Sequence, residues 1–438
     1  MIRRLQALNY RCMQYADVEL GRFHILVGPN ASGKSTLFDV ISFLGDLVSR
    51  GLEAAVDSRT GNFQDLVWGR PAEGLGFELA VEFDIPDKLR KLLPTERDYR
   101  AFRYEVAVRE TEGDIRIDSE RGLLAPYQVP REPIQRELFP EPQQSPSSIL
   151  TGGNRAGWRT ILSKSPQAKD NFFIETSSRS GKGWATSIAF GHRRSALGNL
   201  PESPTTFPVS TYVKSVLGSS IKSFFLDSLR MREASSPARR AEGIAQDGSN
   251  LPWVIKRLEE EYPESYREWL SHVQTTLSDL AYVGVVERED DRHAYLRLRY
   301  KSGVEIPSWM ASDGTLRLLA LTLPAYLPAS DEIYLLEEPE NGIHPLAVDC
   351  VFESLSSVYE SQVLLATHSP VVLRMAALDE ALCFAKDADG ATDIVPGNLH
   401  PRLKDWRGSP NMDVLFASDG GRRCNMDPCN GPLASSLN

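Results

Sequence analysis

Short runs of apolar residues, several of them alternating with polar ones, dominate the first part of the chain, and one long amphipathic stretch interrupts them. Runs of this kind predict strands, some of them half-buried, whereas apolar residues three and four apart predict a helix. The helix is expected to begin at Ser35, after Lys34, and to run through Thr36, Leu37, Phe38, Val40, Ile41 and Leu44. The expected strands, the last three of them forming an antiparallel meander, are Leu5–Tyr10, Phe23–Val27, Gly76–Phe83, Tyr104–Val108 and Asp114–Ile117.

Residues 126–208 have a different texture, rich in Pro, Ser, Gln and Gly. Prolines at 126, 130, 133, 140, 142 and 146 prevent long regular elements. We therefore expect an insertion of loops and short helices, partly mobile. No internal repeat and no heptad pattern is present in it, so it is not expected to form a coiled-coil arm.

Regular periodicity returns after residue 208, with a helix and a strand expected over Val213–Leu229. Leu251–Leu277 predicts a helix that Pro263 kinks or divides. Two strands around a turn at 289–292 should follow, and then a helix, a buried strand, a helix and a second buried strand, Val363–Ala366. This alternation predicts an α/β fold with a mainly parallel sheet covered on both faces. The apolar stripe of the Leu251–Leu277 helix is expected to be Trp253, Ile255, Leu258, Tyr262, Tyr266, Trp269 and Val273.

Composition limits the classes of function. The chain has 438 residues, is 41% hydrophobic and carries a net charge of −10, which gives no overall attraction to nucleic acid or anionic membranes. Five scattered cysteines suit a reducing compartment better than a disulfide framework. The start of the chain lacks the apolar core of a signal peptide, and the longest apolar stretch contains Arg317 and Pro324. We expect a soluble cytoplasmic protein without a membrane partner.

The strongest chemical signal follows the Phe23–Val27 strand and fits the P-loop pattern. Glycines allow the backbone to wrap phosphate oxygens, Lys34 supplies a charge for the β- and γ-phosphates, and the hydroxyl of Ser35 can bind Mg²⁺. The helix that continues through Thr36 points its positive end at the same phosphates. The expected nucleotide-binding residues are Gly28, Pro29, Asn30, Ala31, Ser32, Gly33, Lys34, Ser35 and Thr36.

A second signal lies far downstream, where the apolar run Ile333–Leu336 ends in two carboxylates. Glu337 at the end of this strand can hold Mg²⁺ through its water shell. Glu338 can orient or deprotonate the water that attacks the γ-phosphate. The two signals together predict ATP and Mg²⁺ as cofactors and ATP hydrolysis as the reaction.

Two weaker signals fit the same reaction. Ser312, Asp313 and Gly314 precede a helix and could form a second anion site, although a simple helix N-cap is an open alternative. His368 ends the Val363–Ala366 strand and could contact the γ-phosphate, although a histidine at a strand end is often only structural.

Taken together, these motifs resemble those of ABC-type ATPases of the SMC/RecF/OLD group, and most closely OLD-like AAA-family ATPases without a TOPRIM nuclease domain. Gly28–Ser35 resembles Walker A, Ser312–Thr315 the signature, Leu335–Glu338 Walker B and Glu340–Pro345 the D-loop. The signature departs from the Leu-Ser-Gly-Gly-Gln of transporters. The resemblance implies a switch role for His368 and a Q-loop glutamine that binds the metal after the first helix, for which Gln64 is the nearest candidate.

The resemblance also implies an ABC-type P-loop NTPase head with an N-terminal antiparallel β subdomain and a helical or irregular insertion. The expected parts are residues 1–125 and 209–400 for the head, 126–208 for the insertion and 401–438 for a tail that is disordered towards its end. In relatives two heads enclose two ATP molecules, each held by the P-loop of one copy and the signature of the other. A homodimer or higher oligomer is therefore the expected ATP-bound form.

Several functions remain open on the sequence. The leading one is an ATPase whose dimer regulates a separate effector, a nuclease or toxin, in bacterial anti-phage defence, as the resemblance to OLD-like ATPases without a nuclease domain implies. The 70 residues after His368 are too few for a TOPRIM domain, so we do not expect this chain to cut nucleic acid itself. The alternative is a RecF- or SMC-like DNA-binding ATPase in repair or replication, with the arginine pairs 193–194, 230/232 and 239–240 as contacts. A transporter subunit fits less well. Cys424 and Cys429 with His400 suit zinc only loosely.

Overall fold

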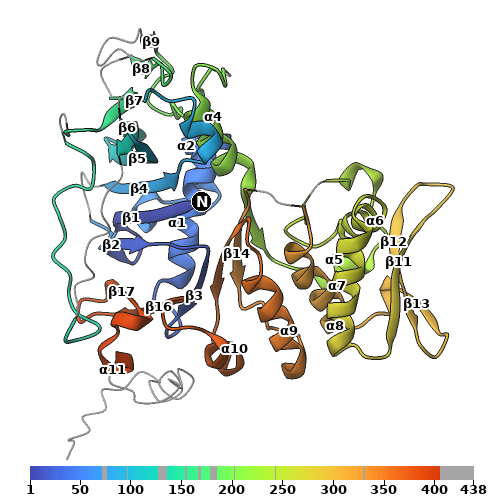
Figure 1. The fold of residues 1–438 in the computed structure, drawn as a ribbon. Coiled ribbons are helices and arrows are strands. Elements are labelled where there is room, and N and C mark those ends of the chain that lie inside the picture. The colour runs from blue at the N-terminus through green and yellow to red at the C-terminus, as the bar shows by residue number, and fades with distance from the viewer. Residues whose placement is uncertain are drawn as a thin grey trace, which may run out of the picture.

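The computed structural model describes residues 1–71, 76–95, 97–126, 136–152, 155–165, 169–177, 185–201, 203–241, 243–328 and 331–404. Within them the chain forms an eight-stranded, a six-stranded and a three-stranded sheet (Figure 1). The eight-stranded sheet has the order β2-β1-β4-β5-β6-β7-β8-β9 and is antiparallel throughout. Its strands are β1 (Ile2–Tyr10), β2 (Met13–Glu19), β4 (Gly76–Asp84), β5 (Tyr99–Thr111), β6 (Asp114–Pro126), β7 (Arg159–Lys164), β8 (Asp170–Phe173) and β9 (Ala185–Ile188).

The six-stranded sheet has the order β10-β14-β15-β3-β16-β17, and only β17 runs antiparallel to its neighbour. Its strands are β3 (Phe23–Val27), β10 (Ile221–Phe224), β14 (Ile333–Glu337), β15 (Gln362–Ala366), β16 (Ala381–Lys386) and β17 (Thr392–Pro396). The three-stranded sheet, at the right of Figure 1, consists of β11 (Leu280–Glu287), β12 (Ala294–Tyr300) and β13 (Glu305–Pro307).

The helices connect and cover these sheets. The α-helices are α1 (Lys34–Arg50), α2 (Leu52–Asp57), α3 (Asp87–Arg90), α4 (Pro208–Ser215), α5 (Ser228–Arg232), α6 (Leu251–Glu261), α7 (Pro263–Thr276), α8 (Asp313–Thr322), α9 (Pro345–Ser356), α10 (Pro370–Met375) and α11 (Pro401–Lys404). The short helices are η1 (Phe63–Leu66), η2 (Val216–Ser220), η3 (Pro237–Arg239), η4 (Ser308–Met310), η5 (Leu323–Ala325) and η6 (Gly397–Leu399).

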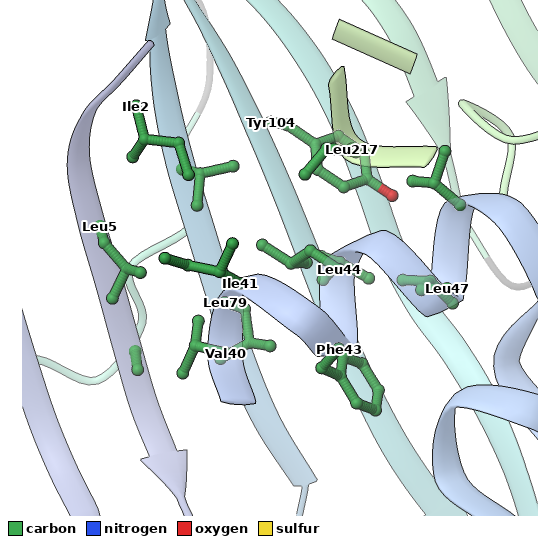
Figure 2. Packing of buried hydrophobic residues seen from close by; sticks show 14 of the residues in the cluster. Ile2, Leu5, Val40, Ile41, Phe43, Leu44, Leu47, Leu79, Tyr104 and Leu217 are labelled. Atoms are coloured by element: carbon green, nitrogen blue, oxygen red, sulfur yellow. The ribbon is translucent and has the colours of Figure 1, made fainter. Parts of the chain in front are cut away.

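The parallel strands are buried on both faces, as their continuous apolar runs predict. Successive residues of a strand point to opposite faces, so Leu335 packs into a core with α1 and the antiparallel sheet, whereas Leu336 packs into a second core with α6 to α10. Figure 2 shows the first core, where Ile41 and Leu44 of α1 lie against Leu5 and Leu79 of the antiparallel sheet. Helix α1 therefore lies between the two large sheets.

The α/β fold class is confirmed, and the structure adds detail that the sequence pattern did not show. Strand β2 was not expected, and β5 and β6 are longer than predicted. Pro263 divides the long helix into α6 and α7, as expected. One residue of the predicted apolar stripe is wrong: Tyr262 is 37% exposed, because the chain leaves the helical conformation there before Pro263 starts α7 in a new phase.

The described part of residues 126–207 also differs from the short helices that we expected. It contributes three strands, β7 to β9, which extend the antiparallel sheet at the edge of β6, together with irregular segments. Pairing to an existing edge supplies backbone hydrogen bonds that the local sequence alone does not indicate. The end of the tail, from residue 405, lies outside the described residues.

An irregular segment of the insertion, residues 136–152, ties the two large sheets together, and we call it the strap (Figure 1). At one end, Asp393 of β17 accepts a hydrogen bond from Arg136 at 2.5 Å and one from the backbone of Glu141 at 2.9 Å. At the other end, Glu78 of β4 and Glu105 of β5 accept bonds from backbone amides of the strap at 2.8 and 2.9 Å. All three carboxylates are buried, so the strap supplies hydrogen bonds that these buried charges need, although Glu105 also pairs with Arg103.

Candidate functional site

The P-loop occupies the turn between β3 and α1, and two neighbours require its glycines. A Cβ at Gly28 would lie 2.2 Å from the carbonyl oxygen of Phe384, and one at Gly33 would lie 2.4 Å from Oγ1 of Thr392. Gly33 also has a φ of +109°, which side chains rarely adopt. The β16–β17 hairpin therefore packs directly against the loop, and Thr392 donates a hydrogen bond to the carbonyl of Ser32 at 2.9 Å.

Lys34 folds back over this loop. Its Nζ donates to the carbonyl oxygens of Gly28 at 2.8 Å and Pro29 at 3.0 Å, and the side chain is buried. Burial lowers the pKa of Lys34, against the opposing effect of the carboxylates of Glu338 and Glu337. The ammonium is thus presented inside the loop, where a phosphate oxygen can replace a carbonyl partner. The hydroxyl of Ser32 is buried without a hydrogen-bond partner among the described residues, which also suits an incoming phosphate.

Ser35 and Thr36 begin α1 and have different surroundings. Ser35 is exposed to the cleft described below, whereas Thr36 is buried, with its hydroxyl 3.1 Å from the sulfur of Cys12 in the β1–β2 turn. Both lie among the residues that line the cleft. Only the Ser35 hydroxyl is therefore open to a metal ion in this arrangement.

The two carboxylates lie where β14 ends. Glu337 is exposed and Glu338 is half-buried, and both side chains line the cleft. The backbone of Glu338 turns away from the direction of β14 with a φ of +45°. Asn341 donates a hydrogen bond to Glu338 Oε2 at 2.5 Å, and the backbone amide of Glu338 donates to Ala366 at 2.8 Å. This positive φ is a strained conformation for a residue with a side chain, of the kind found at functional sites.

His368 follows β15 and faces the same carboxylate, with Nε2 4.0 Å from Glu338 Oε1. Burial lowers the pKa of His368, and the nearby charge of Lys34 lowers it further, against the weaker effect of Glu338. The imidazole is therefore neutral at neutral pH and can either donate or accept a hydrogen bond.

These groups line one cleft of about 950 Å³. It contains Asn30 to Thr36 of the P-loop, Glu337, Glu338 and His368, so the structure brings together motifs from both ends of the chain. Such a volume accommodates a nucleotide. Of the donors that line it, the Ser35 hydroxyl and the Glu337 carboxylate are oxygen ligands of the type that Mg²⁺ prefers.

Several lining residues were missed by the sequence reasoning. They come from the β1–β2 turn, from η1 and the loop that follows it, and from the β16–β17 hairpin, and include Arg11, Cys12, Asp65, Trp68, Arg70 and Lys386. Backbone bonds join the first two segments, from Arg11 to Leu66 at 2.9 Å and from Trp68 to Asn9 at 3.0 Å. Local motifs could not reveal them, because tertiary packing alone brings these turns to the P-loop.

Gln64 is not among the residues that line the cleft. It lies on η1 beside it, and its backbone amide donates to Asn62 at 3.1 Å, while its neighbour Asp65 does line the cleft. The metal-binding role expected for Gln64 therefore stays a prediction.

Ser312, Asp313 and Gly314 also lie outside this cleft, at the N-terminus of α8. Ser312 caps the helix by accepting a hydrogen bond from the Thr315 amide at 3.1 Å, as the sequence predicted. Asp313 pairs with Arg232 at 2.6 Å. Ser312 and Asp313 are exposed to solvent.

The structure also bears on the loosely fitting zinc ligands and on membrane-spanning helices. Among the residues it describes, no group of three or more His, Cys, Asp or Glu side chains could hold a metal ion. Cys424 and Cys429 lie outside the described residues, and His400 is buried against the ring of Phe139 at 5.0 Å between ring centroids. In the same part of the chain, no helix has the length and apolarity needed to cross a membrane.

The fold and the site together define the head of an ABC-type ATPase. The P-loop follows β3 of a mainly parallel sheet, and the two acidic residues follow β14, which is separated from β3 by β15. A capped helix, α8, lies apart from the cleft. A family described as "AAA domain, putative AbiEii toxin, Type IV TA system" matches residues 23–374. The match spans most of the chain, and the protein belongs to this family.

More distant similarities agree with that class. An OLD nuclease from Thermus scotoductus is 44% identical over 48 residues, which is 11% of this chain and 9% of that protein. The chain thus matches only a small part of that relative's length. An SMC head solved with the C-winged helix domain of ScpA has 15% identity and a TM-score of 0.50 over 90% of this chain and 97% of its own.

An SMC head with an extended coiled coil, solved with the C-terminal domain of ScpA from Pyrococcus furiosus, has 14% identity and a TM-score of 0.48, over 90% of this chain and 95% of its own. At such identities the structural similarity shows the fold alone. The family match identifies an AAA-domain ATPase, and the fold is similar to that of an SMC head.

Proposed function

We propose that this protein hydrolyses ATP in a Mg²⁺-dependent reaction and that its ATP-bound dimer regulates a separate effector, a nuclease or toxin, in anti-phage defence. The observation that supports the reaction best is the meeting of Lys34, Glu337, Glu338 and His368 around one cleft that the P-loop closes. Phosphoryl transfer needs little more from a protein than positioning and charge neutralisation, and these groups can supply both.

Each side chain has a distinct part in this proposal. Lys34 leaves the carbonyls of Gly28 and Pro29 to bind phosphate oxygens, and Ser35 and Glu337 hold the metal ion. Mg²⁺ would neutralise the charge that develops on the phosphates. Glu338 accepts the proton of the attacking water, and its bond from Asn341 fixes the carboxylate for that step.

His368 is the proposed contact with the γ-phosphate. Because its imidazole is neutral, it can donate a hydrogen bond to a phosphate oxygen while it stays close to Glu338. Loss of that phosphate would release the contact and signal hydrolysis to the rest of β15.

The position of α8 supports a site shared by two copies. Ser312 to Gly314 form a capped helix start that favours an anion, yet they lie outside the cleft of their own chain. A second copy that docks its α8 against the bound ATP would complete the site, so ATP would hold the dimer together. Gln64 would join the metal site only if η1 moves towards the cleft on binding.

The proposed effector rests on the family rather than on the site. The family description names a toxin and a toxin–antitoxin system, which suits an ATPase that works with a toxic partner. The DNA-clamp alternative has less support, because most of the arginines that suggested it form ion pairs, among them Arg232 with Asp313, Arg193 with Asp114 and Arg240 with Glu287. Paired arginines offer little free charge to phosphates.

The test is to isolate the Glu338→Gln protein from its host with ATP and Mg²⁺, since this variant should stay in the ATP-bound state. Lys34→Ala, which should not bind ATP, is the matched control. A second protein that accompanies only the first variant in stoichiometric amount supports the effector. Nucleic acid without a protein partner, bound in a strongly salt-dependent way, would favour the DNA clamp instead.

A further inference from the structure

The strap, residues 136–152, ends close to the P-loop at one buried carboxylate (Figure 1). Asp393 of β17 is 1% exposed, and its side chain accepts hydrogen bonds from Arg136 at 2.5 Å, from Gln143 at 2.6 Å and from the backbone amide of Glu141 at 2.9 Å. All three donors belong to the strap, and this carboxylate has no other hydrogen-bond partner in the part of the chain that the structure describes. The position of Asp393 therefore depends on the strap.

The residue before Asp393 contacts the P-loop. Successive residues of a strand point to opposite faces, and the hydroxyl of Thr392 donates to the carbonyl of Ser32 at 2.9 Å, while its amide donates to the carbonyl of Cys12 at 2.9 Å. Because a peptide group is planar and trans, a Ser32 carbonyl that faces Thr392 turns the amide of Gly33 in the opposite direction. Amides of such a loop bind phosphate together, so Thr392 helps to set the loop for binding.

The strap is held mainly by polar contacts. Within residues 136–152 only Ile149 is buried, and the segment forms no helix or strand. Segments with few buried apolar contacts open locally at a lower free energy than the core does. The strap can therefore detach from Asp393 while the two large sheets stay folded.

We propose that Asp393 is a positioning residue for the P-loop and that docking of the strap on it sets the affinity for ATP. This inference rests on the proposed binding of ATP, but not on the proposed dimer or effector. With the strap docked, β17 holds the peptide between Ser32 and Gly33 in place. When the strap detaches, the carboxylate of Asp393 loses its donors and has to reach water, which moves β17 and releases Thr392 from Ser32.

Coupling of this kind is reciprocal, so bound ATP favours the docked strap as much as the docked strap favours ATP. The other end of the strap is held by Glu78 and Glu105 of the antiparallel sheet. The strap thus carries the state of the nucleotide site to a different part of the molecule.

The first variant, Gln143→Glu, changes the strap and leaves the cleft untouched. Gln143 is half-buried, and the change places a carboxylate where an amide now donates to Asp393, so that two like charges repel each other. ATP affinity, measured by equilibrium dialysis, should fall about tenfold, within the usual range for coupled sites. Turnover at saturating ATP should stay within about twofold, because Glu338 and His368 are unaffected.

A second change tests whether this one contact is responsible. Asp393→Asn in the Gln143→Glu chain exchanges amide and carboxylate across the same hydrogen bond and leaves Arg136 a carboxylate to pair with. Each single variant should bind ATP more weakly, whereas the double variant should return to within about threefold of the wild type. Arg136→Ala, which removes a different donor, replaces Gln143→Glu should that variant fold poorly.

The control is a buried carboxylate that holds another part of the same insertion. Glu120 of β6 accepts hydrogen bonds from the amides of Ala196 and Leu197 at 2.7 and 2.9 Å, and it does not line the cleft. Glu120→Gln should lower the free energy of unfolding but leave ATP affinity within about twofold. It separates a general loss of stability from a loss of P-loop positioning.

The reciprocal effect needs no change in the strap. Hydrogen exchange of the peptide that contains Glu141, measured by mass spectrometry in the Glu338→Gln background, should slow about tenfold when ATP is added. The protein concentration is kept too low for an ATP-linked dimer. The same peptide in Lys34→Ala, which should not bind ATP, should show no change.

The outcomes separate this inference from the proposed function. If the wild type binds no ATP, the proposed function fails and the inference fails with it. If the wild type binds ATP and both strap variants bind it equally well, only the inference is wrong. An equal loss of affinity in Glu120→Gln, or exchange at Glu141 that ATP does not alter, would also overturn the inference.

Discussion

Replacing Glu338 with glutamine is the most direct test of the chemistry. The side chains have the same size, and glutamine can still accept the hydrogen bond that Asn341 donates at 2.5 Å. The backbone bond to Ala366 and the positive φ are also kept, so the fold and ATP binding should be unaffected. What is lost is the carboxylate that takes the proton of the attacking water.

The size of the loss follows from the neighbours of Glu338. A positioned general base contributes about 10²- to 10⁴-fold, which is about 2.7 to 5.4 kcal/mol of barrier. Nε2 of the neutral His368 imidazole lies 4.0 Å from Glu338 Oε1, so His368 can act as a weaker substitute base in the variant. We therefore expect a loss of turnover at the lower end of this range. Turnover should fall about 10²-fold, and adding His368→Ala should lower it further.

The assay is steady-state release of phosphate, with ATP affinity measured separately by equilibrium binding. Glu337→Gln is the control on the adjacent residue. It should raise the Mg²⁺ concentration needed for half-maximal turnover, which Glu338→Gln should leave unchanged. Normal turnover by Glu338→Gln would refute the assignment of this carboxylate as the base.

Three further predictions follow from the structure. Lys34→Ala should weaken ATP binding at least tenfold, because it removes a charge-assisted hydrogen bond to a phosphate oxygen. Equilibrium dialysis measures this affinity, and unchanged binding would contradict the role of Lys34. Gly33→Ala should destabilise the protein by about 2–4 kcal/mol in denaturant unfolding, because its Cβ would lie 2.4 Å from Thr392 Oγ1. Gly113→Ala, with a φ of +78° and open space around it, should cost only about 1–2 kcal/mol, and equal losses would argue against the clash. Burial raises the pKa of Glu175 to about 6 from 4.5, so its contribution to stability is full below pH 4.5 and is lost as the pH rises through 6. The unfolding free energy of the wild type relative to Glu175→Gln should accordingly fall by about 2 kcal/mol between pH 4.5 and 7, and a flat difference would show that the carboxylate is not perturbed.

The sequence predicted the parts of the site that short motifs specify. The P-loop, the strand that ends at Glu337 and the strand before His368 each combine an apolar run with a polar end, and local sequence determines both. The cap of α8 by Ser312 is likewise local, because it depends on the amide three residues later.

The rest depends on contacts between distant segments. Thr392 donates a hydrogen bond to the carbonyl of Ser32 in the P-loop, although the two residues are 360 positions apart in the sequence. Cys12 and Trp68 line the cleft but belong to turns that contain no recognisable motif. Strands β7 to β9 form because an edge is available at β6, not because their sequence is strongly periodic. The bond from Asn341 to Glu338 required the strained turn that only the structure shows.

Because residues 136–152 form the strap, deletion of residues 126–208 should destabilise the rest of the fold. A shortened chain without them would leave Glu78, Glu105 and Asp393 buried without several of their donors, and a buried carboxylate that loses its partners costs several kcal/mol. Asp393 also adjoins Thr392, whose side chain touches the P-loop, so the damage would reach the ATP site. A chain shortened in this way would therefore need Glu78 and Asp393 replaced as well, because the strap supplies their hydrogen-bond donors.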